Sequence, residues 1–511
     1  MVVGLDGANW DHLAPWLDAG ELPNLKRLIE RAAWSHSASE VPYVTFPNWK
    51  CYSTGKNPGK LGVFWWELVD VANRRVSMPN SRSFKSAELF DYLSDAGYRC
   101  GIINMPTTFP PRPLKNGFMI AGGPGCPDKG YSWPRDLEGM LKKRFDYRTH
   151  PRRAVDSGRK YIEEVLKLID LRFETGKALL DRVDFLQITI FYINMLQHFF
   201  WREEPVLEGW KRIDKHLGDL MQLNCRLVLL SDHGCIRSDR IFNINAWLAS
   251  EGYLVLQKKF ASSRVPMAVK RLVSRLRRNP NLRNRVRRWL PLGLMNRVGL
   301  LQEELRGSLK FQMIDWDHTV AFASGQGPIY LNPESYRYRP GLAGELAHRL
   351  ESLRDPSTDK PPILRVFHRD EVYKGDYLNQ APDLVAEQNE GYYINGRVGR
   401  TRLFESPDLW QAENCRFGIF LMYGPDISPG FKGETKITDI APTMLHWHGL
   451  PVPWDMDGSV LKTFFQPHSH AASESVQYRE AGQTATEHDT GDADEEIIRQ
   501  QLINLGYMEE E

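Results

Sequence analysis

Three residues that could bind a metal ion each lie directly after a predicted strand. Asp6 follows the apolar residues 2–5, and Asp232 and His233 follow the apolar residues 226–230. In an open parallel sheet, the carboxyl ends of the strands share one edge and ligands bind there, so we expect these side chains to lie close together. Carboxylate and imidazole groups suit zinc, and manganese or another divalent ion is an alternative.

Thr45 adds a hydroxyl to this set. It lies in residues 41–62, VPYVTFPNWKCYSTGKNPGKLG. Pro47 suits the first turn of a helix because its missing N–H would be unpaired there. Thr45 would then lie beside a helix N-terminus, which favours anions. It could simply cap the helix. It could also be a nucleophile for phosphoryl transfer, because a bound metal lowers the pKa of a hydroxyl. The joint placement of Asp6, Asp232 and His233 favours the nucleophile.

The elements that must position these residues alternate between strand and helix. Apolar runs predict strands in residues 1–5, 99–104, 184–192, 226–230 and 416–422, and helical spacing predicts helices in residues 23–31, 86–97, 160–183 and 438–448. This alternation predicts an α/β protein of the doubly wound type. Its central sheet would be mostly parallel, with helices on both faces.

Composition excludes several classes of protein. The chain has 511 residues, too many for one simple core, and a net charge of +2, which gives no general attraction to nucleic acid or membranes. Six scattered cysteines without a CxxC pair predict a reducing, cytoplasmic setting. No apolar run reaches the roughly 18 residues that span a bilayer, and the given chain shows no signal peptide.

Shifts in composition divide the chain. Residues 1–257 and 311–465 form the predicted core in two parts, separated by a helical insertion or cap at residues 258–310. Residues 258–306 are rich in Lys and Arg, and only Glu303 and Glu304 are acidic. This stretch could be a lid over an anionic substrate, a membrane-surface contact, a nucleic-acid patch or a solvated basic face. Residues 466–493 predict a polar linker and residues 494–511 a C-terminal helix.

Several motifs together resemble the alkaline phosphatase superfamily. The similarity is to its branch of type I phosphodiesterases and nucleotide pyrophosphatases, and within it to the predicted phosphohydrolases or phosphomutases. The matching motifs are residues 3–8, 45–48, 54–60, 104–107, 197–201, 231–234, 315–316 and 438–443. They run in the family's order up to about residue 465, and they imply an alkaline-phosphatase-like fold.

The resemblance implies roles for individual residues. Asp6, Thr45, Asp232 and His233 would hold one divalent metal ion, with zinc favoured over manganese, magnesium or calcium. Thr45 would be the nucleophile that becomes phosphorylated. Asn48 resembles an asparagine that donates a hydrogen bond to a phosphoryl oxygen, where negative charge develops.

The chain departs from the family pattern at the second metal site. Asn194 stands where the family has the aspartate of Asp-x-x-x-His, and Asn414 stands where it has a histidine. Only His198 of these three ligands is kept. Neutral amides bind zinc far more weakly than carboxylate or imidazole. The sequence therefore predicts one ion rather than two.

Three functions stay open at this point. A one-metal phosphoric ester hydrolase could use His198 as general acid and base. A phosphotransferase or mutase could pass the group from Thr45 to another hydroxyl. A non-catalytic relative could bind a phosphorylated ligand or a partner. The expected substrate is a phosphorylated small molecule or a glycan-type compound. Nucleic acid is not favoured, and residues 258–306 could contact an anionic ligand or a membrane surface.

Overall fold

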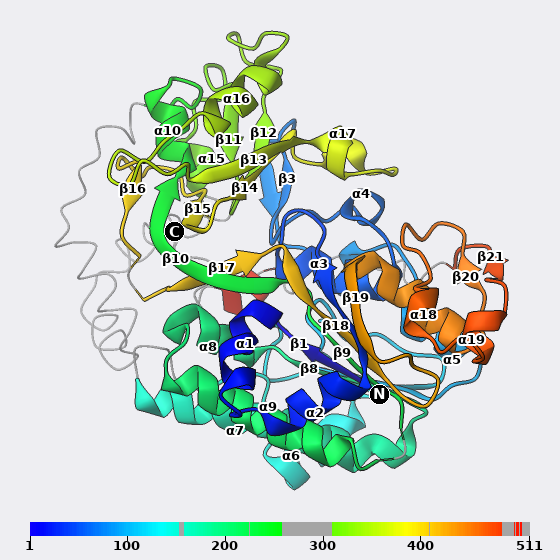
Figure 1. Ribbon diagram of the computed structural model, residues 1–511. Coiled ribbons are helices and arrows are strands. Elements are labelled where there is room, and N and C mark those ends of the chain that lie inside the picture. Colours follow the sequence, from blue (N-terminus) through cyan, green and yellow to red (C-terminus); the bar gives the residue numbers. More distant parts are fainter. Residues whose placement is uncertain are drawn as a thin grey trace, which may run out of the picture.

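The structure is a computed structural model (Figure 1). It describes residues 1–152, 158–223, 225–257, 309–407 and 409–482, together with residues 495, 497–499 and 501–502. The predicted basic insertion, residues 258–310, lies almost entirely outside the described residues.

A mostly parallel sheet forms the centre of the protein. Its nine strands follow the order β19-β2-β18-β9-β1-β8-β5-β6-β7, and five of the eight neighbouring pairs are parallel. The inner strands are short and buried throughout, as expected for strands covered on both faces. Their bounds are β1 Val2–Leu5, β2 Ala33–Ala38, β5 Cys100–Ile103, β6 Gly117–Ile120, β7 Ser132–Trp133, β8 Phe185–Ile190, β9 Leu227–Leu230, β18 Phe417–Tyr423 and β19 Gly430–Lys436.

Helices cover both faces of this sheet (Figure 1). One layer contains α1 Trp10–Asp18, α2 Pro23–Arg31, α6 Asp136–Phe145, α7 Arg159–Leu179, α8 Tyr192–Phe200 and α9 Glu204–Leu220. The other contains α3 Thr45–Thr54, α5 Leu89–Asp95 and α18 Ile440–Trp447, which pack against one another. The predicted α/β fold with a mostly parallel sheet is therefore confirmed.

A second, smaller unit has its own core. Strand β10, Gly234–Asn243, leaves the central sheet and pairs with β15 Gly391–Asn395, β16 Phe404–Glu405 and β17 Ala412–Cys415. Beside it lies an antiparallel sheet of β11 Ala321–Ala323, β12 Pro328–Leu331, β14 Leu384–Gln388 and β13 Ile363–His368. Helices α10 Ile244–Ser250, α15 Leu309–Met313 and α16 Leu342–Glu351 accompany these strands. Apolar runs at residues 320–323 and 329–331 predict two of these strands, β11 and β12, whereas the others are short or partly exposed.

The remaining elements are short. They are α4 Pro58–Leu61, β3 Leu68–Asp70, β4 Arg75–Ser77, α17 Arg369–Val372, β20 Val452–Pro453, α19 His470–Ser473 and β21 Tyr478–Arg479. In the described ranges, none of the helices has both the length and the apolar character needed to span a bilayer. All six cysteines are unpaired.

The described part of the predicted polar linker contains secondary structure. Residues 466–482, the described part of the predicted linker, contain α19 and β21, and β21 pairs with β20. Further on, the described residues between 495 and 502 are helical. Ile498 and Leu502 are buried there, and Glu495 accepts a hydrogen bond from the N–H of Met78 at 3.0 Å. The described residues between 495 and 502 therefore pack against the N-terminal part of the core.

Candidate active site

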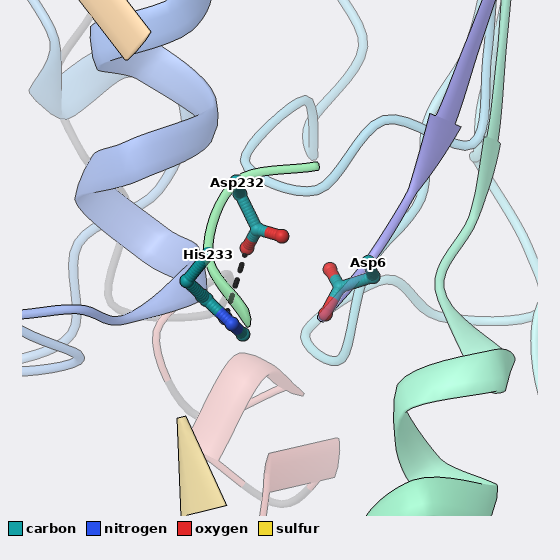
Figure 2. A group of neighbouring side chains, drawn as sticks. All are labelled: Asp6, Asp232 and His233. Atoms are coloured by element: carbon teal, nitrogen blue, oxygen red, sulfur yellow. Dashed lines mark ion pairs between the residues drawn. The ribbon is translucent and has the colours of Figure 1, made fainter. Parts of the chain in front are cut away.

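Asp6, Asp232 and His233 come together at the carboxyl ends of two neighbouring strands (Figure 2). Asp6 follows β1, and the other two follow β9, which pairs with β1 in parallel. All three are fully buried, and one ligand atom from each lies within 4.8 Å of the others. The N–H of Gly7 donates to Oδ1 of Asp232 at 3.3 Å, so the turn after β1 also orients this carboxylate.

Thr45 completes the cluster from the first turn of α3. The N-cap of this helix is Val44, and no side chain caps it, so Thr45 does not serve as the cap. Its hydroxyl is fully buried, with Oγ1 at 3.0 Å from Nε2 of His233. The structure thus brings together all four residues that the sequence assigned to the metal site.

The imidazole of His233 has a defined orientation. Its Nδ1 lies 2.9 Å from the carbonyl oxygen of Gly234, which can only accept, so Nδ1 carries a proton. Its Nε2 lies 3.0 Å from Thr45 Oγ1 and 3.0 Å from Oδ2 of Asp232. Burial alone would lower the pKa of His233, but the charge of Asp232, followed by that of Asp6, raises the pKa to about 9.

These contacts fit a metal ion. Burial, reinforced by the charge of Asp232, raises the pKa of Asp6 well above its usual value. Two buried carboxylates and an imidazole nitrogen face one another, and such an arrangement requires positive charge between them. A proton on Nε2 of His233 supplies it in the free protein. A divalent cation would satisfy the same atoms, and carboxylate, imidazole and hydroxyl ligands suit zinc or manganese.

The carboxylate of Asp6 is fixed by two further side chains. The indole N–H of Trp49 donates to Oδ2 at 2.9 Å, and the amide of Asn194 donates to Oδ1 at 2.9 Å. Trp49 follows Thr45 by one helical turn, so both lie on the same face of α3. A Cβ on Gly4 would lie 2.5 Å from the Trp49 ring. Gly4 therefore allows the indole to cross β1 and reach Asp6.

Asn194 is a hydrogen-bond donor in this structure. Its Oδ1 accepts from Nε2 of Gln197 at 3.3 Å, and the same Nε2 also donates to the carbonyl of Gly7 at 3.0 Å. Oε1 of Gln197 accepts in turn from the Trp210 indole at 3.2 Å. Every amide atom of Asn194 thus has a partner. The amide that stands where the resemblance implies a carboxylate is therefore hydrogen-bonded at both ends.

His198 is held beside this network as a neutral ring. Its Nδ1 donates to the carbonyl oxygen of Ala412 at 2.7 Å, and its ring stacks on Trp410 with centroids 4.0 Å apart. Burial, helped by the charge of His233, lowers the pKa of His198 to about 3. In this state Nδ1 carries the one proton and is directed at Ala412, and the role of general acid and base that we expected for His198 stays a prediction.

Asn48 holds the chain that leads to Thr45. Its Oδ1 accepts from the N–H of Glu40 at 2.8 Å. Its Nδ2 lies 3.1, 3.0 and 3.0 Å from the carbonyl oxygens of Glu40, Pro42 and Val44. These bonds engage both ends of the amide, so a hydrogen bond to a phosphoryl oxygen would require one of them to be exchanged. The structure gives Asn48 a positioning role in the loop before Thr45.

Asn414 lies on β17, opposite Cys235 of β10. Its Oδ1 is buried and has no hydrogen-bond partner among the described residues. The sulfur of the next residue, Cys415, accepts a hydrogen bond from the amide of Asn9 at 3.4 Å. Burial raises the pKa of the Cys415 thiol to about 12, which disfavours the thiolate that binds metals.

Sequence reasoning missed several residues around the site. Trp49 could have been found from its spacing to Thr45, and Gln197 from its spacing to Asn194. Glu413 gave no signal. It is fully buried, accepts from the Trp410 indole and from Gln326 at 2.9 Å, and burial raises its pKa to about 7.

Comparison with known proteins identifies the family. The family described as type I phosphodiesterase / nucleotide pyrophosphatase matches residues 1–409. The chain belongs to this family. This membership confirms the predicted enzyme class, a phosphoric ester hydrolase or phosphotransferase of the alkaline phosphatase superfamily.

One solved structure shares the fold of this family member, and another is less similar. The structure of phosphonoacetate hydrolase from Sinorhizobium meliloti 1021 in complex with phosphonoacetate matches with a TM-score of 0.53 and 16% sequence identity. The match covers 86% of this chain and 93% of the hydrolase chain. Human ectonucleotide pyrophosphatase / phosphodiesterase 5 matches with a TM-score of 0.48 and 15% sequence identity. The match covers 90% of this chain and 96% of the human chain. A search of curated protein sequences finds no match.

Proposed function

We propose that this family member is a metal-dependent phosphoric ester hydrolase that uses Thr45 as its nucleophile. One observation carries the proposal. The Thr45 hydroxyl lies 3.0 Å from Nε2 of His233, inside a fully buried cluster with two carboxylates at the carboxyl ends of adjacent strands. A capping role would not place the hydroxyl there.

Asp6, Thr45, Asp232 and His233 are the ligands that we propose for a single ion, zinc by preference. When bound, the ion would lower the pKa of the Thr45 hydroxyl and supply positive charge beside the attacked phosphorus. The proposal of a single ion is supported by the contacts of the Asn194 amide, because its nitrogen donates to Asp6 and its oxygen accepts from Gln197.

The residues of the chain account for a two-step reaction. As Oγ1 of Thr45 bonds to phosphorus, the proton of the hydroxyl passes to water, the bond from phosphorus to the leaving oxygen breaks, and that oxygen takes up a proton from water. A second water then attacks the same phosphorus and gives up a proton, the bond to Oγ1 breaks, and Oγ1 takes up a proton from water, which restores the hydroxyl. The neutral ring of His198, which holds its proton on the Ala412 side, is our candidate to accept the proton of this water.

The test uses two substitutions of the nucleophile. Thr45→Ala removes the hydroxyl, and Thr45→Ser keeps it as a matched control. Turnover of an aryl phosphodiester and covalent labelling of the protein should be lost in the alanine variant and retained, at reduced rate, in the serine variant. Metal content, measured by mass spectrometry, should remain in both because three other ligands are present.

Two results would count against this function. Turnover that survives in Thr45→Ala would exclude the covalent route. Absence of both bound metal and Thr45-dependent labelling in the wild type, across a panel of phosphate esters, would leave a binding protein. Transfer of the labelled group to an added alcohol in preference to water would identify a phosphotransferase instead.

A further inference from the structure

His198 is held by residues 410–412, the short segment that leads into β17 of the smaller unit. The indole ring of Trp410 stacks on the imidazole, with centroids 4.0 Å apart and an angle of 21° between the planes. The carbonyl oxygen of Ala412 accepts from Nδ1 of His198 at 2.7 Å, and the N–H of Gln411 donates to the carbonyl oxygen of His198 at 2.6 Å. Both the ring and the backbone of His198 are therefore fixed by this segment.

The side of α8 that carries His198 faces the metal cluster. His198 follows Asn194 by four residues, so both lie on the same face of the helix. The Asn194 amide donates to Asp6 at 2.9 Å. After burial, the charge of His233 is a further cause that lowers the pKa of His198, so the two rings are close enough to interact electrostatically. Because Nδ1 carries the proton, Nε2 is the acceptor nitrogen of this ring.

Glu413 fixes the indole that stacks on His198. Its Oε1 accepts from the indole N–H of Trp410. Its Oε2 accepts from Nε2 of Gln326 at 2.9 Å and from the N–H of Asn414 at 3.2 Å. An indole that turned in its plane would lose its bond to a carboxylate that is only 1% exposed, which costs free energy. The orientation of the Trp410 ring is therefore set by Glu413.

An acid at position 413 is costly if its only purpose is packing. Burial raises the pKa of Glu413 to about 7, which shows that its ionised form is disfavoured there. The Trp410 ring already packs edge-on against Phe199, with centroids 5.1 Å apart. Buried acids with perturbed titration are concentrated at functional sites. A role in orienting His198 accounts for an acid that the packing alone does not require.

We propose that Glu413 is a positioning residue for the second step of the reaction, because it holds the Trp410 indole, which keeps the His198 ring in the orientation that directs Nε2 to the attacking water. This inference rests on the proposed hydrolase function and adds the residues that control hydrolysis of phosphorylated Thr45. In that step the water gives one proton to Nε2 as its oxygen bonds to phosphorus. The bond from phosphorus to Oγ1 breaks, Oγ1 takes up a proton from water, and His198 then returns its extra proton to water.

The experiment separates the two steps of the reaction with an aryl phosphodiester. The ratio kcat/KM reports the steps up to departure of the aryl group, whereas kcat also includes hydrolysis of phosphorylated Thr45. Glu413→Leu should lower kcat by about 10–100-fold and leave kcat/KM unchanged. The fraction of protein phosphorylated on Thr45 during turnover, measured by mass spectrometry after quenching, should rise. A variant that merely contains less folded protein would lose kcat and kcat/KM equally.

Three variants test the route from Glu413 to His198. Glu413→Gln keeps an oxygen that can accept from the indole, so kcat should return toward that of the wild type. Trp410→Phe keeps a ring to stack and removes the N–H that Glu413 binds, so it should raise the phosphorylated fraction in a variant with little change in packing. His198→Ala should lower kcat as well, and adding Glu413→Leu to it should have little further effect because the two act in one chain.

Asp214 provides a matched control for the loss of a buried carboxylate. It is 5% exposed and accepts from the amide of Asn24 at 2.8 Å and from the N–H of Leu25 at 2.7 Å. Asp214→Asn should lower the free energy of unfolding and leave the phosphorylated fraction of Thr45 as in the wild type. An increase in that fraction in the control would show that loss of stability alone produces the effect, and would overturn the inference.

The outcomes separate this inference from the proposed function. If kcat and kcat/KM fall together in Glu413→Leu and in Trp410→Phe, or if the losses in Glu413→Leu and His198→Ala add, the positioning role is overturned and the hydrolase function stands. Turnover that persists in Thr45→Ala would overturn both, because no phosphorylated Thr45 would exist to be hydrolysed. Absence of turnover of every ester by the wild type would also overturn both.

Discussion

The contact between Asn194 and Asp6 allows a quantitative test of the electrostatics of the site. Asn194→Asp exchanges the amide that donates to Asp6 at 2.9 Å for a second carboxylate of nearly the same shape. The change removes a hydrogen bond and places two acids in a fully buried position. It also introduces the acid that the resemblance to the family implies at this position.

The size of the effect follows from two competing costs. Two unit charges about 3 Å apart repel by about 5–6 kcal/mol at an effective dielectric constant of about 20. Protonating an acid of ordinary pKa, about 3.9, costs about 4 kcal/mol at pH 7 and about 1.5 kcal/mol at pH 5. Protonating one carboxyl costs less free energy than holding two repelling charges, so the metal-free variant should bind one extra proton. It should therefore be destabilised by about 4 kcal/mol at pH 7.

The sign of the pH dependence follows from the same argument. The folded variant holds a proton that the unfolded chain releases, so its stability falls as pH rises above about 4. The loss relative to the wild type should grow by about 1.4 kcal/mol for each pH unit between 5 and 7. Urea unfolding in EDTA at pH 5, 6 and 7 measures this slope.

A matched control exists elsewhere in the chain. Asn24 donates to Oδ2 of Asp214 at 2.8 Å, away from the metal cluster and nearer to solvent. Asn24→Asp should show a smaller, similarly signed pH dependence because water screens the pair. Zinc should restore the stability of Asn194→Asp and not that of Asn24→Asp. A loss at position 194 that does not change with pH, or that zinc does not reverse, would refute this account of the site.

Three further predictions concern the same cluster. Trp49→Phe removes the indole donor to Asp6 and should weaken zinc binding by about 10–100-fold in chelator competition, while a zinc affinity equal to that of the wild type would exclude this supporting role. Burial lowers the pKa of His233, but the charge of Asp232 raises it to about 9. Because zinc must displace the proton of His233, zinc affinity should rise with pH up to about 9. A zinc affinity that does not change with pH would contradict that charge state. Burial raises the pKa of Glu413 from 4.5 to about 7. The free energy of unfolding of the wild type should therefore fall by up to about 3 kcal/mol as pH rises from about 4.5 to 7. Glu413→Gln should abolish that slope in urea titrations.

The sequence by itself determined the fold class and the core of the site. Apolar runs with alternating helices predicted a parallel sheet, and Asp6 and Asp232 follow two of its strands directly. Neighbouring parallel strands end at one edge, so two residues more than 200 positions apart were expected to meet. That inference needs only local patterns and one rule of topology.

The tertiary structure decided which polar atoms pair with one another. Sequence patterns left Thr45 as either a cap or a nucleophile, and the packing of α3 against the strand ends directs its hydroxyl to His233. Asn48 was expected to face a phosphoryl group, and the loop before Thr45 engages its amide instead. Such pairing depends on contacts between segments that are distant in sequence, and local sequence patterns do not predict these contacts.

The same reason explains why the approach of residues 41–43 to β14 and β17 was not foreseen. These segments lie far apart in sequence and meet because β10 carries the chain from the central sheet to the smaller one. Glu387 and Asn414, which line the space between them, are ordinary polar residues in short strands. The positions of the strands are indicated locally by hydrophobic pattern, whereas the surroundings of a polar side chain are fixed by distant contacts.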